Sequence, residues 1–154
     1  MIWDGMFDDI KIDEVYALNN WPELPLGSFG VYSGRMMAAV AEFDITVKGM
    51  VGHAATPHLA IDPVVISAQV ISAVQTIISR STDPVDKALI SITKINAGTA
   101  YNVIDDQVKM GGTIRTFRRE TRAYIEKRFN ELCKGIADAH GAEIKIEFDL
   151  VNKY

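Results

Sequence analysis

Residues 43–63, FDITVKGMVGHAATPHLAIDP, contain in turn a strand pattern, a loop with two histidines and a helix start. The first six residues alternate between apolar and polar, which is the period of a strand that buries one face. Gly49 and Gly52 then bracket a turn. Asp62 before Pro63 is typical of a helix start, because the aspartate can accept hydrogen bonds from the first backbone N–H groups. A loop held between two rigid elements can position side chains for chemistry.

The rest of the chain extends this unit into a complete α+β domain. Helical spacing of apolar residues predicts helices at 63–80 and at about 120–140, and further strands are expected at 88–95, 107–117 and 144–150. With the strand that begins near Ala41, the order is βαββαβ. We therefore predict a ferredoxin-like βαββαβ sandwich, in which a four-stranded antiparallel sheet carries both helices on one face.

Individual residues refine these elements. The predicted buried stripe of the first helix comprises Val64, Ala68, Ile71 and Ile78, widened by Val65, Val74 and Ile77. The stripe of the second helix comprises Ile125, Phe129, Leu132 and Ile136. Gly141 is expected to end that second helix. Gly111 and Gly112, inside a strand, predict a bulge or a close approach of another backbone.

Residues 1–38 differ from the rest. Residues 15–18 form a short apolar run that could be a buried strand, but the prolines and glycines that follow interrupt regular structure. This segment has too few partners to make a sheet of its own. We expect it to be a piece of another domain, or a tail lying on the domain at 39–154.

Composition narrows the class of protein. The 154 residues suffice for one ordinary domain, and 48% hydrophobic with 23% charged residues predicts a packed core. A net charge of −4 and the lack of an apolar run of membrane-spanning length argue against nucleic acid and membrane as partners. The single cysteine, Cys133, is expected in the core, and with no secretory signal pattern it favours a cytoplasmic location. RNA-recognition modules share this element order, but glycines occupy the strand at 107–117 where stacking aromatics would be needed.

Three polar residues in loops or near strand ends stand out as candidates for chemistry: His53, Asn102 and Arg115. Taken alone, each also has an ordinary structural explanation. The histidine and asparagine could be turn residues, and the arginine could be a solvated charge.

Three blocks of sequence change that balance: GMVGHAATPHLAIDPV (49–64), NAGTAYNVIDD (96–106) and GGTIRTF (111–117). In order and separation they resemble blocks of the carboxypeptidase–aminoacylase family of metal-dependent amidohydrolases. The branch they resemble contains hippurate hydrolase and auxin-conjugate (indoleacetyl-amino-acid) amidohydrolase. Residues 13–31 resemble the stretch just before that family's inserted domain, so the resemblance spans almost the whole chain. It implies that residues 1–38 are a remnant of the family's catalytic domain and that residues 39–154 are the inserted domain.

The resemblance implies roles for the candidate residues. In this family the inserted ferredoxin-like domain is a lid and a dimerisation surface over a two-metal catalytic domain. His53 would be the catalytic lid histidine that reaches the partner subunit's active site and stabilises the oxyanion. Asn102 and Arg115 would hold the substrate carboxylate, which the planar guanidinium matches with two parallel hydrogen bonds. His58 is assigned to loop structure, with a substrate or interface role as the alternative. We expect His53, Asn102 and Arg115 to converge along one rim of the sheet.

The sequence departs from the family pattern at two positions. Asn19 stands where the family has a metal-ligand histidine, and asparagine is a poor substitute for imidazole on such an ion. Asp105 stands where a proline is usual, which predicts a looser loop around Asn102. Complete members use a pair of divalent metals (zinc, manganese or nickel), whose ligands lie mostly in parts this chain lacks. No metal or other cofactor is therefore expected in this chain.

Two functional hypotheses remain open. In the first, the chain is the lid and dimerisation domain of an amidohydrolase that cleaves N-acyl amino acids of the hippurate or indoleacetyl type, truncated and inactive alone. In the second, it is a non-catalytic homodimerising interaction module. Both predict a homodimer, and the catalytic domain of an intact relative is a further possible partner.

Overall fold

The computed structural model describes residue 5 and residues 11–150, with the side chain of Leu150 left out. The chain divides into two compact units, Met1–Gly34 and Arg35–Tyr154. The parts of the predicted 1–38 and 39–154 segments that cover residues 1–4, 6–10 and 151–154 lie outside the described residues.

The first unit has little regular structure. Between residues 11 and 34 the structure contains turns but neither a helix nor a strand. The expected buried strand at 15–18 is wrong, since Val15 and Tyr16 are 73% and 85% exposed. An apolar run alone does not make a strand when no neighbouring strand supplies hydrogen bonds.

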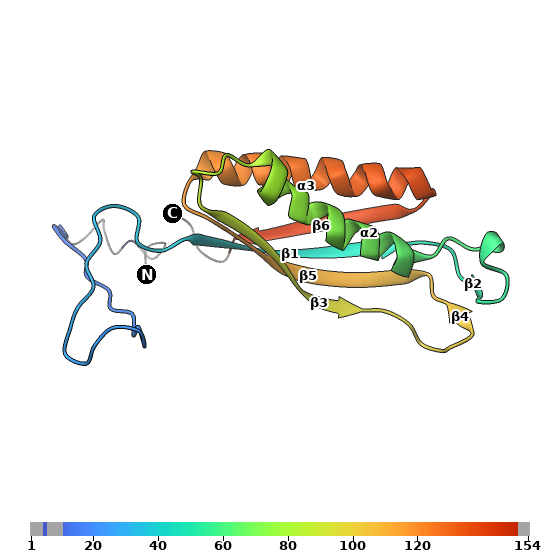
Figure 1. Ribbon diagram of the computed structural model, residues 1–154, viewed down its shortest axis with the longest axis horizontal. Coiled ribbons are helices and arrows are strands. Elements are labelled where there is room, and N and C mark those ends of the chain that lie inside the picture. Colours follow the sequence, from blue (N-terminus) through green and yellow to red (C-terminus); the bar gives the residue numbers. More distant parts are fainter. Residues whose placement is uncertain (1–4, 6–10, 151–154) are drawn as a thin grey trace. The chain divides into compact units, whose positions relative to one another are not determined.

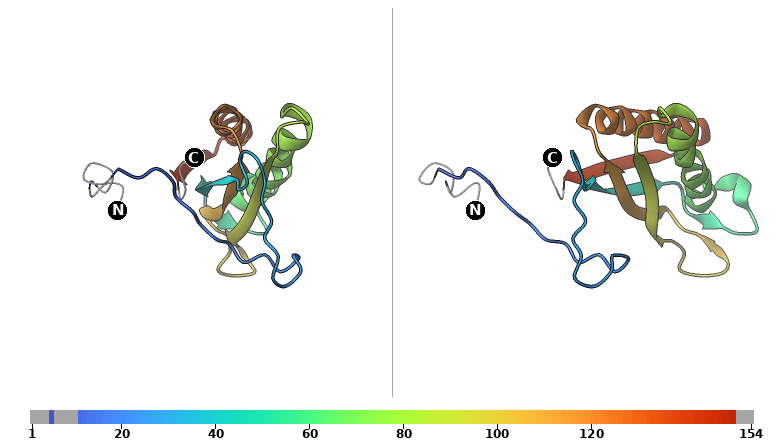
Figure 2. Two further views of the ribbon diagram at one scale, coloured as in Figure 1. Left: turned by 90° about the vertical axis from the view of Figure 1, so that its left-hand side faces the viewer. Right: turned by 60° about the vertical axis from the view of Figure 1, so that its left-hand side comes forward.

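The second unit is the predicted sandwich (Figure 1). Its elements, in chain order, are β1 Ala39–Lys48, β2 Gly52–His53, η2 Pro57–Leu59, α2 Pro63–Thr76, η3 Ile77–Ser81, β3 Ala88–Asn96, β4 Val103–Ile104, β5 Gln107–Thr116, α3 Arg119–His140 and β6 Glu143–Leu150. The four long strands form one antiparallel sheet in the order β3-β5-β1-β6. Both helices cover the same face of this sheet, and the opposite face is open (Figure 2). The ferredoxin-like α+β prediction is confirmed.

The core lies between the sheet and the helices. Alternate residues of β1 face the helices and are buried, while Glu42, Asp44 and Lys48 lie on the open face. Phe43 packs on Phe129 of α3 with ring centroids 4.9 Å apart, and Phe148 lies 5.8 Å from Phe129. This aromatic cluster holds α3 against the centre of the sheet.

The glycine pair in β5 permits a close approach, as predicted. A Cβ atom on Gly112 would lie 2.7 Å from the Phe43 ring and would also collide with the carbonyl oxygen of Ser91. The bulge is in β3 rather than in β5, because Thr93 is skipped between Ile92 and Lys94 in the pairing with β5. Any side chain at position 112 would push the edge strand away from the sheet.

The helix ends follow the sequence signals. Asp62 caps α2, accepting a hydrogen bond from Val64 N at 2.8 Å, and a π-helical turn, η3, completes the helix as far as Ser81. Gly141 ends α3 with φ of 69°.

The predicted stripe of α2 is partly wrong. Val74 and Ile77 are buried as expected, but Val64, Val65 and Ala68 are exposed. Ile66 and Val70 take the inward positions instead. Because apolar residues occur at both inward and outward positions of α2, periodicity could not identify its inner face. On α3, Ile125, Phe129 and Cys133 are buried, and Leu132 and Ile136 pack against the core.

Candidate functional site

A short ribbon, absent from our sequence prediction, extends from one end of the sheet. It consists of β2 and β4, in which Gly52 pairs with Ile104 and His53 pairs with Val103. Met50 and Ile61 form a bridge at its base, with reciprocal N···O distances of 2.9 and 3.1 Å. This ribbon and η2 lie beyond the ends of β1 and β5 (Figure 1). We call residues 50–61 and 97–106 the tip.

His53 begins a tight turn at the tip. Its carbonyl oxygen accepts a hydrogen bond from Thr56 N at 2.8 Å, and its ring Nδ1 accepts one from Ala55 N at 3.1 Å. Neither Ala54 nor Ala55 has a positive φ, which makes this a type I turn. The ring is exposed, so His53 can meet a ligand or another chain at the tip.

Asn102 lies next to His53. The carbonyl oxygen of Asn102 accepts a hydrogen bond from Ala54 N at 3.0 Å, in addition to the pairing between His53 and Val103. Asp105, expected to loosen this loop, instead accepts a hydrogen bond from Thr99 Oγ1 at 2.8 Å and so ties its two ends together. The structure therefore brings His53 and Asn102 together on one backbone framework.

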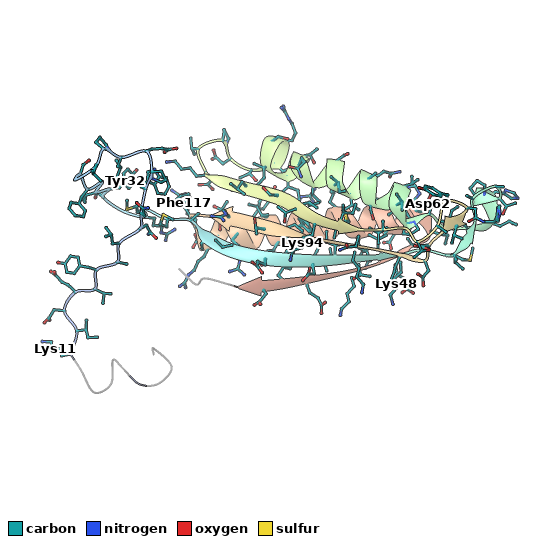
Figure 3. All side chains as sticks on the ribbon, turned by 90° about the horizontal axis from the view of Figure 1, so that it is seen from below. Lys11, Tyr32, Lys48, Asp62, Lys94 and Phe117 are labelled. Carbon is teal, nitrogen blue, oxygen red and sulfur yellow. The ribbon has the colours of Figure 1, made fainter. Side chains whose placement is uncertain are left out.

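Arg115 does not join them, and the predicted convergence of all three residues is wrong. Arg115 pairs with Val40 and Leu89 near the opposite end of β5. Arg115 lies eight residue steps along the strand from Gln107 at the tip end of β5, a distance of about 26 Å. Figure 3 shows Phe117, which follows β5, at the opposite end of the sheet from Lys48 and Asp62. Arg115 is exposed on the sheet's open face.

The other candidates are more scattered. His58 is exposed on η2, at the tip but without a fixed role. Asn19 is exposed in the first unit. Burial raises the pKa of the Cys133 thiol to about 12, so this cysteine is a neutral thiol in the core at neutral pH.

The donor set does not fit a two-metal centre. Within the described part of the chain, no group of three or more His, Cys, Asp or Glu side chains could hold a metal ion. A catalytic metal in this fold family needs several such ligands converging on one point. No chemical step through a metal is therefore assigned to these residues.

A second candidate surface runs along one side of the sandwich. The α2–β3 side consists of the outward face of α2 and η3 together with the edge strand β3, which lies below α2 (Figure 2). Only Arg80 is charged in Pro63–Ser81, and only Lys94 is charged in β3. Val65 and Ile95, on the two elements, are 51% and 54% exposed. Exposed apolar side chains with few charges beside an open strand edge favour association with another chain.

The apolar composition of α2 and η3 could also be explained by a membrane-spanning role. In the described part of the chain, the stretch Pro63–Ser81 is long and apolar enough to cross a membrane by length and composition alone. A helix that packs on a sheet in a soluble protein passes the same test, and α2 buries Ile66, Val70 and Val74 against this sheet.

Comparison with known proteins gives a consistent assignment. Residues 38–140 match the family model described as peptidase dimerisation domain. The chain is 39% identical over 137 residues to an N-acetylcysteine deacetylase of Bacillus subtilis, covering 89% of this chain and 36% of that protein. It is 40% identical over 149 residues to an N-acetyldiaminopimelate deacetylase of Enterococcus faecalis, covering 97% of this chain and 39% of that protein. The chain thus spans less than half the length of these relatives.

Solved structures agree. A putative aminohydrolase from methicillin-resistant Staphylococcus aureus superposes with a TM-score of 0.71 at 32% identity, over 73% of this chain and 30% of that one. A dinuclear metal-binding peptidase of the M20 family from Bacillus subtilis superposes with a TM-score of 0.64 at 36% identity, over 85% of this chain and 31% of that one.

Proposed function

Since the chain belongs to the peptidase dimerisation domain family of the M20 peptidases, we propose that it is the lid and dimerisation domain of a metal-dependent amidohydrolase acting on N-acyl amino acids. The observation that carries this proposal is the family match over residues 38–140, which includes every helix and strand of the sandwich except β6. The names of its relatives, two deacetylases of N-acetylated amino acids, favour a small acyl group. Hippurate and indoleacetyl substrates remain predictions from the sequence resemblance.

The α2–β3 side supports a homodimer in which two edge strands pair. A two-fold axis perpendicular to the sheet would place β3 antiparallel to β3 of the second copy and keep both helix layers on one face. The same operation brings the two α2 helices together, so Val65 and its apolar neighbours are covered along with the strand edge. A two-fold axis along the strands would leave the helices on opposite faces and their apolar surfaces uncovered.

This arrangement also accounts for the separation of the candidate residues. In antiparallel pairing, the start of β3 in one copy lies beside the end of β3 in the other. Arg115 is opposite Leu89 at the start of β3, and the tip follows the end of β3. His53 and Asn102 of one copy are therefore carried to the Arg115 end of the second copy. We infer that His53 and Asn102 of one chain share an active site with Arg115 of the second chain, and that Arg115 of the first chain serves the other active site.

The chemistry of these residues fits a substrate with a carboxylate and a reacting amide. Arg115 can bind the carboxylate through two parallel hydrogen bonds, and Asn102 can add a further donor. His53 can donate to the oxygen that becomes negative when the amide is attacked, an interaction worth about 3 kcal/mol of barrier in a water-excluded site. The metal pair that would activate water would be held by a catalytic domain, as the family resemblance implies. With Cys133 a free thiol, we also propose a cytoplasmic location.

A domain exchange tests the proposal. Residues 38–150, which include β6, would replace the matching segment of the Bacillus subtilis N-acetylcysteine deacetylase, and hydrolysis of acetyl, benzoyl and indoleacetyl amino acids would be measured. We expect an active dimer that loses at least 100-fold in kcat when His53→Ala is added. His53→Asn is the matched control for folding, because asparagine can accept the same turn hydrogen bond from Ala55 N. A folded, dimeric chimaera with no activity on any substrate would contradict the lid role.

The alternative, a non-catalytic homodimerising module, is favoured by the lack of a metal-binding cluster among the described residues. Both proposals expect the chain alone to show no hydrolysis with added zinc, manganese or nickel. They separate in the domain exchange, where a module without a catalytic role would give a dimer whose activity does not depend on His53.

A further inference from the structure

The backbone N–H groups that follow His53 are each committed to a different acceptor. Ala54 N donates to the carbonyl oxygen of Asn102, Ala55 N donates to His53 Nδ1, and Thr56 N donates to the carbonyl oxygen of His53. The histidine thus occupies the first position of a type I turn and uses its ring nitrogen as aspartate or asparagine uses a carboxyl or amide oxygen. Its ring is held by its own turn.

This contact determines which nitrogen carries the proton. A backbone N–H can only donate, so Nδ1 must present its lone pair at 3.1 Å from Ala55 N. A neutral imidazole has one donor and one acceptor nitrogen, which leaves the proton on Nε2. We propose that Ala55 is a positioning residue, whose backbone N–H holds His53 as the neutral Nε2–H tautomer with its donor directed away from the turn.

The inference adds a requirement to the proposed function. An Nε2–H donor can bind an anionic oxygen, such as a carboxylate or the oxyanion of an amide addition, whereas an unprotonated Nε2 would repel it. The use of this donor in catalysis rests on the proposed function. The tautomer itself rests only on the turn, and it can be tested in the chain without any catalytic partner.

The other histidines provide internal references. His58 lies on η2 and is exposed. His140 contacts Gln69 Oε1 through Nε2 at 2.9 Å, where its ring can donate, so it should also carry its proton on Nε2. A hydrogen bond of ordinary net strength favours one tautomer roughly fivefold. We therefore expect His53 to populate the Nε2–H tautomer more fully than His58 does.

Nitrogen NMR of the chain labelled with ¹⁵N-histidine measures this directly, at about pH 8.5, two units above the ordinary imidazole pKa. In the unmodified chain, the Nε2 of His53 should resonate as a protonated ring nitrogen and its Nδ1 as an unprotonated one. Averaged shifts matching those of His58, or a protonated Nδ1, would overturn the proposal.

Two proline variants make the test specific. Ala55→Pro removes the N–H that faces Nδ1 and also strains the turn, because a proline at its third position forces Ala54 out of the helical region. The His53 shifts should then move toward the values of His58. Ala54→Pro removes only the N–H that binds Asn102 and suits the second position of a type I turn, so the His53 shifts should stay unchanged. His53 shifts that stay unchanged in Ala55→Pro, or that move by the same amount in both variants, would show that the Ala55 N–H does not set the tautomer. An inactive domain exchange would leave these outcomes unaffected, so the two proposals fail separately.

Discussion

The α2–β3 side and the opposite side of the sandwich each consist of one helix above one edge strand, but they differ in charge. On the opposite side, α3 carries ion pairs between residues one turn apart, among them Arg122–Glu126 at 2.6 Å and Lys127–Glu131 at 3.9 Å. The edge strand there, β6, alternates charged residues with apolar ones and contains a Lys145–Glu147 contact. The α2–β3 side has one charged residue on each element, Arg80 and Lys94.

This difference in charge favours the α2–β3 side as the surface that a second chain would cover. Charged residues on an edge strand oppose pairing with another strand, because the charges would have to be desolvated. The α3–β6 side has this protection, and its apolar residues face inward. The α2–β3 side leaves apolar residues of both helix and strand uncovered, as expected of a surface whose second half is another chain.

The largest effect is expected in the core beneath α3, on the α3–β6 side. Phe129→Ala removes the ring that α3 packs between Phe43 and Phe148, and should lower the free energy of unfolding by about 3–5 kcal/mol. The matched control is Tyr124→Ala on the outer face of the same helix, which should cost less than about 0.5 kcal/mol. Urea unfolding at fixed protein concentration measures both. Similar losses for the two variants would mean that α3 has a partner on its outer face too.

The next largest effect is expected on the α2–β3 side. Val65→Glu places a charge on the outer face of α2, and the dimer should weaken at least 100-fold, about 3 kcal/mol, because the carboxylate would be buried without a partner. Tyr124→Glu places the same charge on α3 and should leave the dimer intact. Sedimentation velocity over a range of concentrations measures both. Dissociation by Tyr124→Glu alone would assign the interface to the α3–β6 side.

A smaller effect concerns pH. Because burial raises the pKa of Cys133 from 9.0 to about 12, the folded state keeps its thiol proton while the unfolded chain loses it. Stability from this group is complete below about pH 9 and falls above it, by roughly 2 kcal/mol between about pH 9 and 11. Cys133→Ala should remove this part of the pH dependence in urea unfolding. Equal slopes for the two proteins would show that the thiolate forms without cost, and hence that the α3–β6 side is less tightly packed.

Much of the fold follows from local sequence signals. The alternation of β1, the Asp62–Pro63 start of α2 and the Gly141 end of α3 each have a direct physical cause, and each is found where expected. The β2–β4 ribbon could not be predicted this way, because strands of two residues have no period. The prediction of the inward face of α2 was partly wrong for a different reason, because apolar residues also occupy outward positions of this helix.

The site was predicted in part. The adjacency of His53 and Asn102 depends on ribbon pairing, which has no local signature. The separation of Arg115 was available from the sequence, because a predicted strand at 107–117 has a known length and places its two ends far apart. Expecting all three residues at one rim overlooked that length. The distance between Arg115 and the tip is what favours an active site built from two chains.

In the proposed dimer, two copies pair through the α2–β3 side, and the tip of one copy lies at the Arg115 end of the other. Spin labels at Tyr101→Cys in one chain and Arg115→Cys in a second, both with Cys133→Ser, would measure that distance by double electron–electron resonance. A doubly labelled chain diluted in unlabelled protein gives the distance within one chain, which exceeds about 26 Å. We predict a shorter distance between chains than within one. A longer distance between chains, or no coupling between them, would contradict the account.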